Sequence, residues 1–136
     1  MKKKTIALVS HDGKKLDMIE WANYNRESLA KYNLIGTFTT STRIKNATGL
    51  DISYLEPKEF SSGPSGGDLL LAAEILKGNI DVLIFFIDPT TVHPHADDIA
   101  ALQRVTALKN IDMALNRKTA DSILIALTQD ETLETQ

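Results

Sequence analysis

The sequence predicts an α/β domain built around a parallel β-sheet. Short apolar segments rich in β-branched and aromatic residues alternate with segments whose apolar residues recur at helical spacing. The apolar segments are nearly unbroken, which is typical of strands covered by helices on both faces. The chain has 136 residues, a length that suits one domain over 1–136.

In the first half of the chain, apolar runs predict strands and the spacing of apolar residues predicts helices between them. Thr5–Val9 is a short apolar run, and the residues after it place their apolar side chains on one helical face. Gly49 supplies a helix end. The elements expected here are strands at Thr5–Val9, Leu34–Phe38 and Ile52–Leu55, and helices at Lys14–Tyr32 and Ser41–Ala47.

The second half begins with an irregular segment, 56–68, that contains three glycines and two prolines. The clearest strand follows it, because six of the seven residues of Asp81–Ile87 are apolar. The polar end of the chain, 129–136, is expected to be a mobile tail. The other elements expected here are helices at Leu69–Lys77, Asp97–Lys109 and Thr119–Leu127, and a strand at Ile111–Leu115.

Composition and charge exclude several classes of protein. A formal net charge of −3 gives no electrostatic reason to expect nucleic-acid binding. The absence of cysteine excludes a disulfide framework and fits a reducing compartment. The apolar run near the N-terminus is too short for a signal peptide, and no segment approaches the roughly 20 apolar residues of a membrane span. We therefore expect a cytoplasmic protein without a membrane or nucleic-acid partner.

Polar clusters follow the predicted strands, where ligands of parallel sheets bind. They lie at 10–14, 39–42 and 88–98, and a glycine-rich loop at 61–68 precedes a helix. Glycines, hydroxyl groups and helix N-termini all suit an anion. Each cluster taken alone also fits ordinary capping, by Asp68 of its helix and by one hydroxyl of the threonine run.

Lysine and histidine side chains near the ends of the predicted strands could take part in catalysis. Lys15 can neutralise a phosphate, and His11 can polarise a carbonyl or carry a proton. His93 and His95 lie beside acidic residues, which leaves a metal site open. Acid–base chemistry is the better supported interpretation, because carboxylates and imidazoles converge near the expected phosphate site. Asp97 is interpreted as a helix N-cap.

Several motifs resemble those of the methylglyoxal synthases, in family order and at family spacing over roughly residues 5–125. The resemblance implies a three-layer α/β/α, doubly wound, flavodoxin-like fold. It also implies a homohexameric lyase of the glycolytic bypass that converts dihydroxyacetone phosphate, through an enediolic intermediate, into methylglyoxal and phosphate. Phosphate would be product and inhibitor, and no metal or organic cofactor would be needed. The motifs are HD followed by lysine, the paired threonines, ATG at 47–49, SGPxGGD at 62–68, DVLIFFxDP at 81–89 and PHxxD at 94–98.

The resemblance also implies roles for individual residues. Asp68 would be the base that removes a proton from C3 of the substrate. His95 would contact the oxygens of the intermediate, with His11 supporting the same region, and Arg104 would serve a neighbouring subunit. The acids implied around them are Asp12, Asp88 and Asp98, and the phosphate-binding residues are Lys15, Thr37, Phe38, Thr39, Thr40, Ser62 and Gly63, together with His11 and His95.

Two other functions remain open on the sequence. One is a non-catalytic, phosphate- or metabolite-binding regulatory domain of the same superfamily, which would not need Asp68. The other is a receiver-type signalling domain using Asp12 and Lys118, although the SGPSGGD loop has no place in it. The threonine loop also departs from the family pattern, with Phe38 and Ser41 where glycines are usual. We expect phosphate affinity and regulation to differ there.

Overall fold

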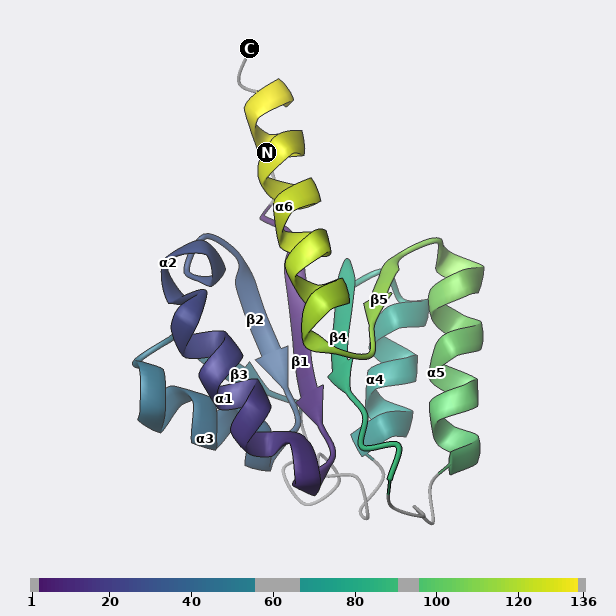
Figure 1. Cartoon of the computed structure of the whole chain (residues 1–136). Helices are drawn as coiled ribbons and strands as arrows, with labels where there is room; N and C mark the ends of the chain where they lie inside the picture. The colour runs from purple at the N-terminus through teal and green to yellow at the C-terminus, as the bar shows by residue number, and fades with distance from the viewer. Residues whose placement is uncertain (1–2, 56–66, 91–95, 135–136) are drawn as a thin grey trace.

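Helices cover both faces of a five-stranded parallel sheet (Figure 1). The computed structural model describes residues 3–55, 67–90 and 96–134, with only the backbone described at 67–68, 96–98 and 132–134. The strands are β1 (Thr5–Ser10), β2 (Asn33–Gly36), β3 (Ile52–Tyr54), β4 (Val82–Phe86) and β5 (Asp112–Ala114). The helices are a 3-10 turn η1 (Asp12–Lys14), α1 (Lys15–Tyr24), α2 (Arg26–Leu29), α3 (Phe38–Thr48), α4 (Gly67–Leu76), α5 (Ala96–Lys109) and α6 (Arg117–Glu134).

The strands lie in the order β3-β2-β1-β4-β5, and every pair is parallel. The chain winds outward from β1 through β2 to β3, then crosses back to β4 and winds outward to β5. This confirms the expected doubly wound, three-layer arrangement. Flavodoxin itself has the order 2-1-3-4-5, so the likeness to it is one of layers and not of strand order. The switch point of this sheet lies between β1 and β4.

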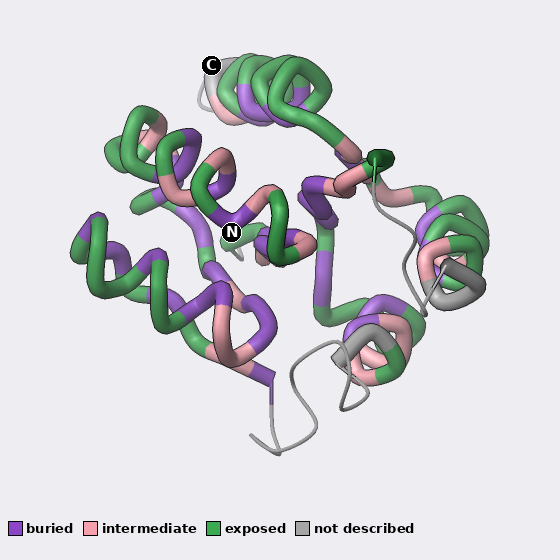
Figure 2. The backbone as a smooth tube through the Cα atoms, turned by 60° about the horizontal axis from the view of Figure 1, so that its bottom comes forward, coloured by how far each residue is buried: buried purple, intermediate pink, exposed green. Residues whose placement is uncertain are grey.

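Alternate residues of each strand enter two separate cores. Ile6 and Leu8 of β1 face one core, which α1, α2, α3 and α6 cover. Ala7 and Val9 face the other, which α4 and α5 cover. Figure 2 shows the helices buried on the sides that face the sheet and exposed on the opposite sides. Burial on both faces explains why the strand sequences are continuously apolar.

The helix expected over Lys14–Tyr32 is instead three short elements: η1, α1 and α2. Asn25 makes the break between α1 and α2. Its backbone N–H and its side-chain Nδ2 both donate to the carbonyl of Trp21, at 3.0 and 2.9 Å. An asparagine side chain that competes for backbone acceptors in this way favours a helix end.

The predicted boundary between β2 and α3 was also wrong. β2 ends at Gly36, and α3 begins at Phe38 rather than at Ser41. A Cβ on Gly36 would lie 2.5 Å from the carbonyl oxygen of Leu8 and 2.8 Å from Oγ of Ser41. Glycine therefore lets the chain turn into α3 directly against β1. At the other end of α3, Gly49 has φ of +77° and ends the helix as predicted.

The last helix extends beyond the predicted Thr119–Leu127 at both ends. The Asn116 side chain accepts the Thr119 N–H at 2.9 Å and caps the start. Near the other end, burial and a hydrogen bond to Glu131 raise the pKa of Tyr32 to about 12. α6 runs to Glu134, so residues 129–134, which were expected in a tail, are the last turns of this helix. None of the helices in the described ranges is long and apolar enough to span a membrane.

A part-buried hydrogen bond joins α1 to α6 and gives a first prediction. The indole N–H of Trp21, a residue 1% exposed, donates to the Asp121 carboxylate at 2.8 Å. Asp121→Ala leaves that N–H buried without this acceptor, so the free energy of unfolding should fall by about 1–3 kcal/mol. Urea unfolding measures the loss. Asp130→Ala, an exposed change on the same helix, should alter stability by less than about 0.5 kcal/mol; equal losses in both variants would contradict the assignment.

Candidate active site

The candidate site lies where β1 and β4 end side by side at the switch point. The two strands pair from Ile6 with Val82 to Ser10 with Phe86. The His11 N–H then donates to the carbonyl of Phe86 at 3.1 Å, which extends the pairing by one residue. Crevices at switch points, outside the carboxyl ends of the strands, are where open α/β sheets bind ligands. The sequence prediction of a polar edge is therefore correct for these two strands.

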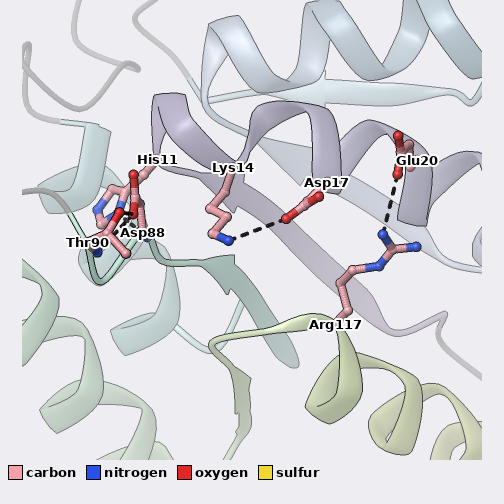
Figure 3. Close-up of polar contacts among 7 residues, drawn as sticks. All are labelled: His11, Lys14, Asp17, Glu20, Asp88, Thr90 and Arg117. Atoms are coloured by element: carbon pink, nitrogen blue, oxygen red, sulfur yellow. Dashed lines mark hydrogen bonds and ion pairs between the residues drawn. The ribbon is translucent and has the colours of Figure 1, made fainter.

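His11 and Asp88 lie across this junction from one another (Figure 3). The backbone N–H of Asp88 donates to Nδ1 of His11 at 2.9 Å. The His11 ring also packs edge-on against Phe85, with centroids 5.2 Å apart. Because Nδ1 accepts a hydrogen bond, the neutral ring must carry its proton on Nε2. This arrangement makes Nε2 a hydrogen-bond donor, and it leaves no basic nitrogen while the bond to Nδ1 persists.

Lys15 opens α1 and is 8% exposed. Its Nζ donates to the Ser10 carbonyl at 3.1 Å and to Oγ1 of Thr40 at 3.4 Å, and it lies 3.5 Å from the Asp12 carboxylate. Burial lowers the pKa of Lys15 from its usual 10.5, and Asp12 opposes that shift. The Asp12 side chain is 99% exposed, so water screens its charge. Burial therefore disfavours the protonated ammonium, and an anion placed beside it would favour it.

Thr37 and Thr40 connect Lys15 to the start of α3. Both are buried, and Oγ1 of Thr37 donates to Oγ1 of Thr40 at 3.3 Å. Thr37 occupies the N-cap position, yet its side chain makes no capping bond. The hydroxyl residues at 39–42 all lie inside α3, so the alternative that one of them caps this helix is wrong. Thr39 is half-buried in the first turn, where backbone N–H groups lack helical acceptors and suit an anion.

The two departures from the family pattern pack into the structure without filling the junction between β1 and β4. Phe38 is the first residue of α3, not the end of a strand, and its ring packs edge-on against Tyr54 with centroids 5.0 Å apart. Ser41 lies within α3, 2% exposed, and donates to the carbonyl of Ser53 at 3.0 Å. Both side chains thus hold the start of α3 against β3.

The remaining predicted residues fall into two groups. Asp68 and Asp98 lie in the first turns of α4 and α5, where only the backbone is described, and Arg104 is exposed on α5. Asp97 is the second residue of α5, so it is not at the N-cap. Within the described ranges no group of three metal-ligating side chains occurs. The residues that lie outside the described ranges are Ser62, Gly63, His93 and His95.

Sequence reasoning missed two residues that contact Asp88. Thr90 donates to Oδ1 of Asp88 through its N–H at 3.0 Å and its hydroxyl at 2.6 Å. Gly13 lies so close to Oδ2 of Asp88 that a Cβ there would collide with it. An Asp-Pro-Thr tripeptide is a recognisable side-chain-stabilised turn, so the sequence could have predicted the contact of Thr90 with Asp88. No sequence pattern predicts the contact of Gly13, because it joins residues 75 positions apart.

Comparison with known proteins identifies the family. The model of the MGS-like domain matches residues 17–115. A methylglyoxal synthase of Clostridium beijerinckii is 46% identical over 119 residues, which cover 88% of this chain and 96% of that protein. The chain belongs to the methylglyoxal synthase family. A methylglyoxal synthase of Leptospira interrogans is 43% identical over 121 residues, covering 89% of this chain and 78% of that protein.

A solved structure of the methylglyoxal synthase family agrees with the fold described above. The crystal structure of methylglyoxal synthase from Elizabethkingia anophelis matches with a TM-score of 0.81 and 41% identity, over 90% of this chain and 77% of that one. At this identity the likeness extends beyond the fold to the family. The resemblance first indicated by the HD, SGPxGGD and FFxDP motifs is thereby confirmed.

The buried lysine gives a second prediction. Inorganic phosphate should stabilise the protein against thermal unfolding, by about 2.7 kcal/mol at a hundred times its dissociation constant. Lys15→Met should lose most of this protection, because it removes the ammonium that faces the anion. Lys45→Met makes the same change of charge at an exposed position of α3 and should keep it. A Lys15→Met protein protected as well as the wild type would rule out phosphate binding at Lys15.

Proposed function

We propose that this chain is a methylglyoxal synthase, a carbon–oxygen lyase that converts dihydroxyacetone phosphate into methylglyoxal and inorganic phosphate. Identity of 42–46% to proteins of that name supports the reaction. The observation in this chain that supports the proposal most directly is the buried Lys15, which donates to Thr40 in the first turn of α3. His11, at the end of β1, adds an imidazole whose Nδ1 accepts a hydrogen bond and whose Nε2 is therefore a donor. Such a site suits a small phosphorylated carbonyl compound.

In this proposal the phosphate lies at the first turn of α3. The Lys15 ammonium and the hydroxyls of Thr37 and Thr40 would contact its oxygens, with the backbone N–H groups of Phe38 and Thr39. Ser62 and Gly63 would complete the cradle, as the resemblance implies. A dianion there compensates a buried ammonium whose Asp12 neighbour is almost fully solvated. Binding energy from the phosphate can then orient the reacting carbons.

The first chemical step is the transfer of a proton from C3 of the substrate to the Asp68 carboxylate. The electron pair of that C–H bond forms a C2–C3 double bond, and the carbonyl oxygen becomes an oxyanion. His11 is a donor at Nε2, so it can stabilise this oxyanion together with His95 but cannot take the proton. This assignment leaves the carboxylate as the base.

The second step expels phosphate. The C3 hydroxyl gives up its proton and becomes the aldehyde carbonyl, while the C2–C3 π pair forms a C1–C2 double bond. The C1–O bond breaks, its electron pair leaves with phosphate, and the released hydroxyl proton can pass to that phosphate. The remaining enolate takes a proton at C1, returned by Asp68, which turns C1 into the methyl group and C2 into the ketone of methylglyoxal. Asp12, Asp88 and Asp98 are proposed as the acids that surround these transfers. Elimination requires the C–O bond to align with the enediolate π system, so the cradle must fix orientation as well as charge.

The reaction as written needs no metal and no organic cofactor, since every proton and electron pair moves between substrate and protein groups. We further propose that the chain acts in the cytoplasm as a homohexamer, with Arg104 directed to a neighbouring subunit and phosphate acting as an inhibitor. These statements rest on the family resemblance. The exposure of Arg104 on α5 is compatible with a contact between subunits.

A matched pair of variants tests the base. Asp68→Asn should lower kcat for methylglyoxal formation by a factor on the order of 10³ or more, because the amide cannot accept the proton. Inorganic phosphate should still bind, since the cradle is intact. Asp51→Asn, an exposed change on the loop before β3, should retain wild-type activity. The assay follows methylglyoxal and released phosphate over a range of phosphate concentrations.

The alternative of a non-catalytic binding domain predicts a different pattern. Phosphate or dihydroxyacetone phosphate would bind to the wild type, but no methylglyoxal would form at any phosphate concentration. Turnover retained in Asp68→Asn would instead keep the reaction and reject Asp68 as the base.

A further inference from the structure

The Asp88 carboxylate is held in a defined position just beyond β4. Both the N–H and the hydroxyl of Thr90 donate to Oδ1, at 3.0 and 2.6 Å. Two hydrogen bonds to one oxygen of an ionised carboxylate are short and strong, and they fix its rotation. Figure 3 shows Asp88 and Thr90 beside the His11 ring.

The second oxygen of Asp88 lies against the backbone of the β1–α1 turn. A Cβ added to Gly13 would collide with Oδ2 and lie 3.3 Å from Cγ of the same carboxylate. Among the described residues, the glycines with positive φ are Gly49 and Gly78, and Gly13 is not one of them. The backbone at Gly13 would therefore accept a side chain. It is the space taken by the carboxylate that requires glycine here.

The hydrogen bond that determines which nitrogen of His11 carries the proton also joins the β1–α1 turn to the residues after β4. Asp88 donates its backbone N–H to Nδ1 of His11, and its carboxylate packs on Gly13 two residues further along. The Thr90 bonds and the contact with Gly13 anchor the Asp88 side chain on both sides, which restricts movement of the whole residue. A displacement of Asp88 would carry its backbone N–H away from Nδ1 of His11.

We propose that Gly13 and Thr90 are positioning residues for the proposed reaction: together they fix Asp88, whose backbone N–H holds His11 as the Nε2–H tautomer. The inference rests on the proposed function for its kinetic consequence, but not for the tautomer. His11 is thereby a donor before substrate arrives, and no reorganisation is needed when the oxyanion forms. Neither residue needs to touch the substrate.

Three variants test the kinetic part. Thr90→Val removes the hydroxyl donor and Gly13→Ala fills the space of Oδ2, so each should lower kcat by about tenfold or more. KM for dihydroxyacetone phosphate should change by less than about threefold, because the phosphate cradle is untouched. Thr90→Ser keeps the donor and should restore at least half of the wild-type kcat. The matched control is Thr106→Val, which removes a hydroxyl bonded to the Gln103 carbonyl on α5 and should leave kcat unchanged.

Nitrogen-15 NMR of the ligand-free protein tests the tautomer without any turnover. The chain has three histidines, and comparison with His11→Gln assigns the His11 signals. At neutral pH the wild type should show Nδ1 unprotonated and Nε2 protonated, and Thr90→Val and Gly13→Ala should show a mixture of tautomers.

The proposal is overturned if His11 keeps the same tautomer in both variants, or if their losses appear in KM with kcat unchanged. If the wild type forms no methylglyoxal, the proposed function fails, and the NMR comparison alone then decides whether Gly13 and Thr90 hold His11. Because Thr90 is exposed, its variant gives a result even if Gly13→Ala does not fold.

Discussion

The parallel pairing of β1 with β4 is the constraint on which the site depends. These strands are neighbours in the sheet although about 75 residues separate them, and the chain winds away from their junction in both directions. The two apolar cores pack against β1 and β4 from opposite faces of the sheet. The residues after each strand meet at the sheet edge: His11 and Gly13 from β1, Asp88 and Thr90 from β4.

A buried charge on one side of this junction defines what the site can bind. Lys15 is carried inward by the first turn of α1, and Gly36 lets α3 approach closely enough for Thr40 to reach the ammonium. Desolvation of a cation is costly unless an anion or hydrogen bonds compensate it. The hydrogen bonds present are two, and the nearby carboxylate is solvated. In the proposed function, a bound phosphate would compensate this buried charge.

The sequence predicted the layers, all five strands and the polar edge, because those follow from local apolar patterns. It placed α3 three residues late, because Gly36 acts through a contact with Leu8 on another strand that no local pattern encodes. It joined α1 to α2 because the apolar spacing continues past Asn25, whose local bond to Trp21 ends α1. In the site, the motifs identified His11, Lys15 and Asp88. They did not identify Gly13, whose requirement comes from the Asp88 side chain beyond the end of β4, far away in the sequence. The end of α6 was missed because the sequence over 129–134 is polar and lacks apolar residues at helical spacing.

The most direct measurement of the central claim follows one sample of the wild-type protein with dihydroxyacetone phosphate by ³¹P and ¹H NMR. Phosphate elimination at the β1–β4 junction predicts that inorganic phosphate and methylglyoxal appear together, in equal amounts, as the substrate signal disappears. Conversion to glyceraldehyde 3-phosphate would show that the site abstracts the proton but holds the phosphate out of the plane required for elimination. An unchanged substrate signal, with binding still detectable, would contradict the claim that this chain is an enzyme.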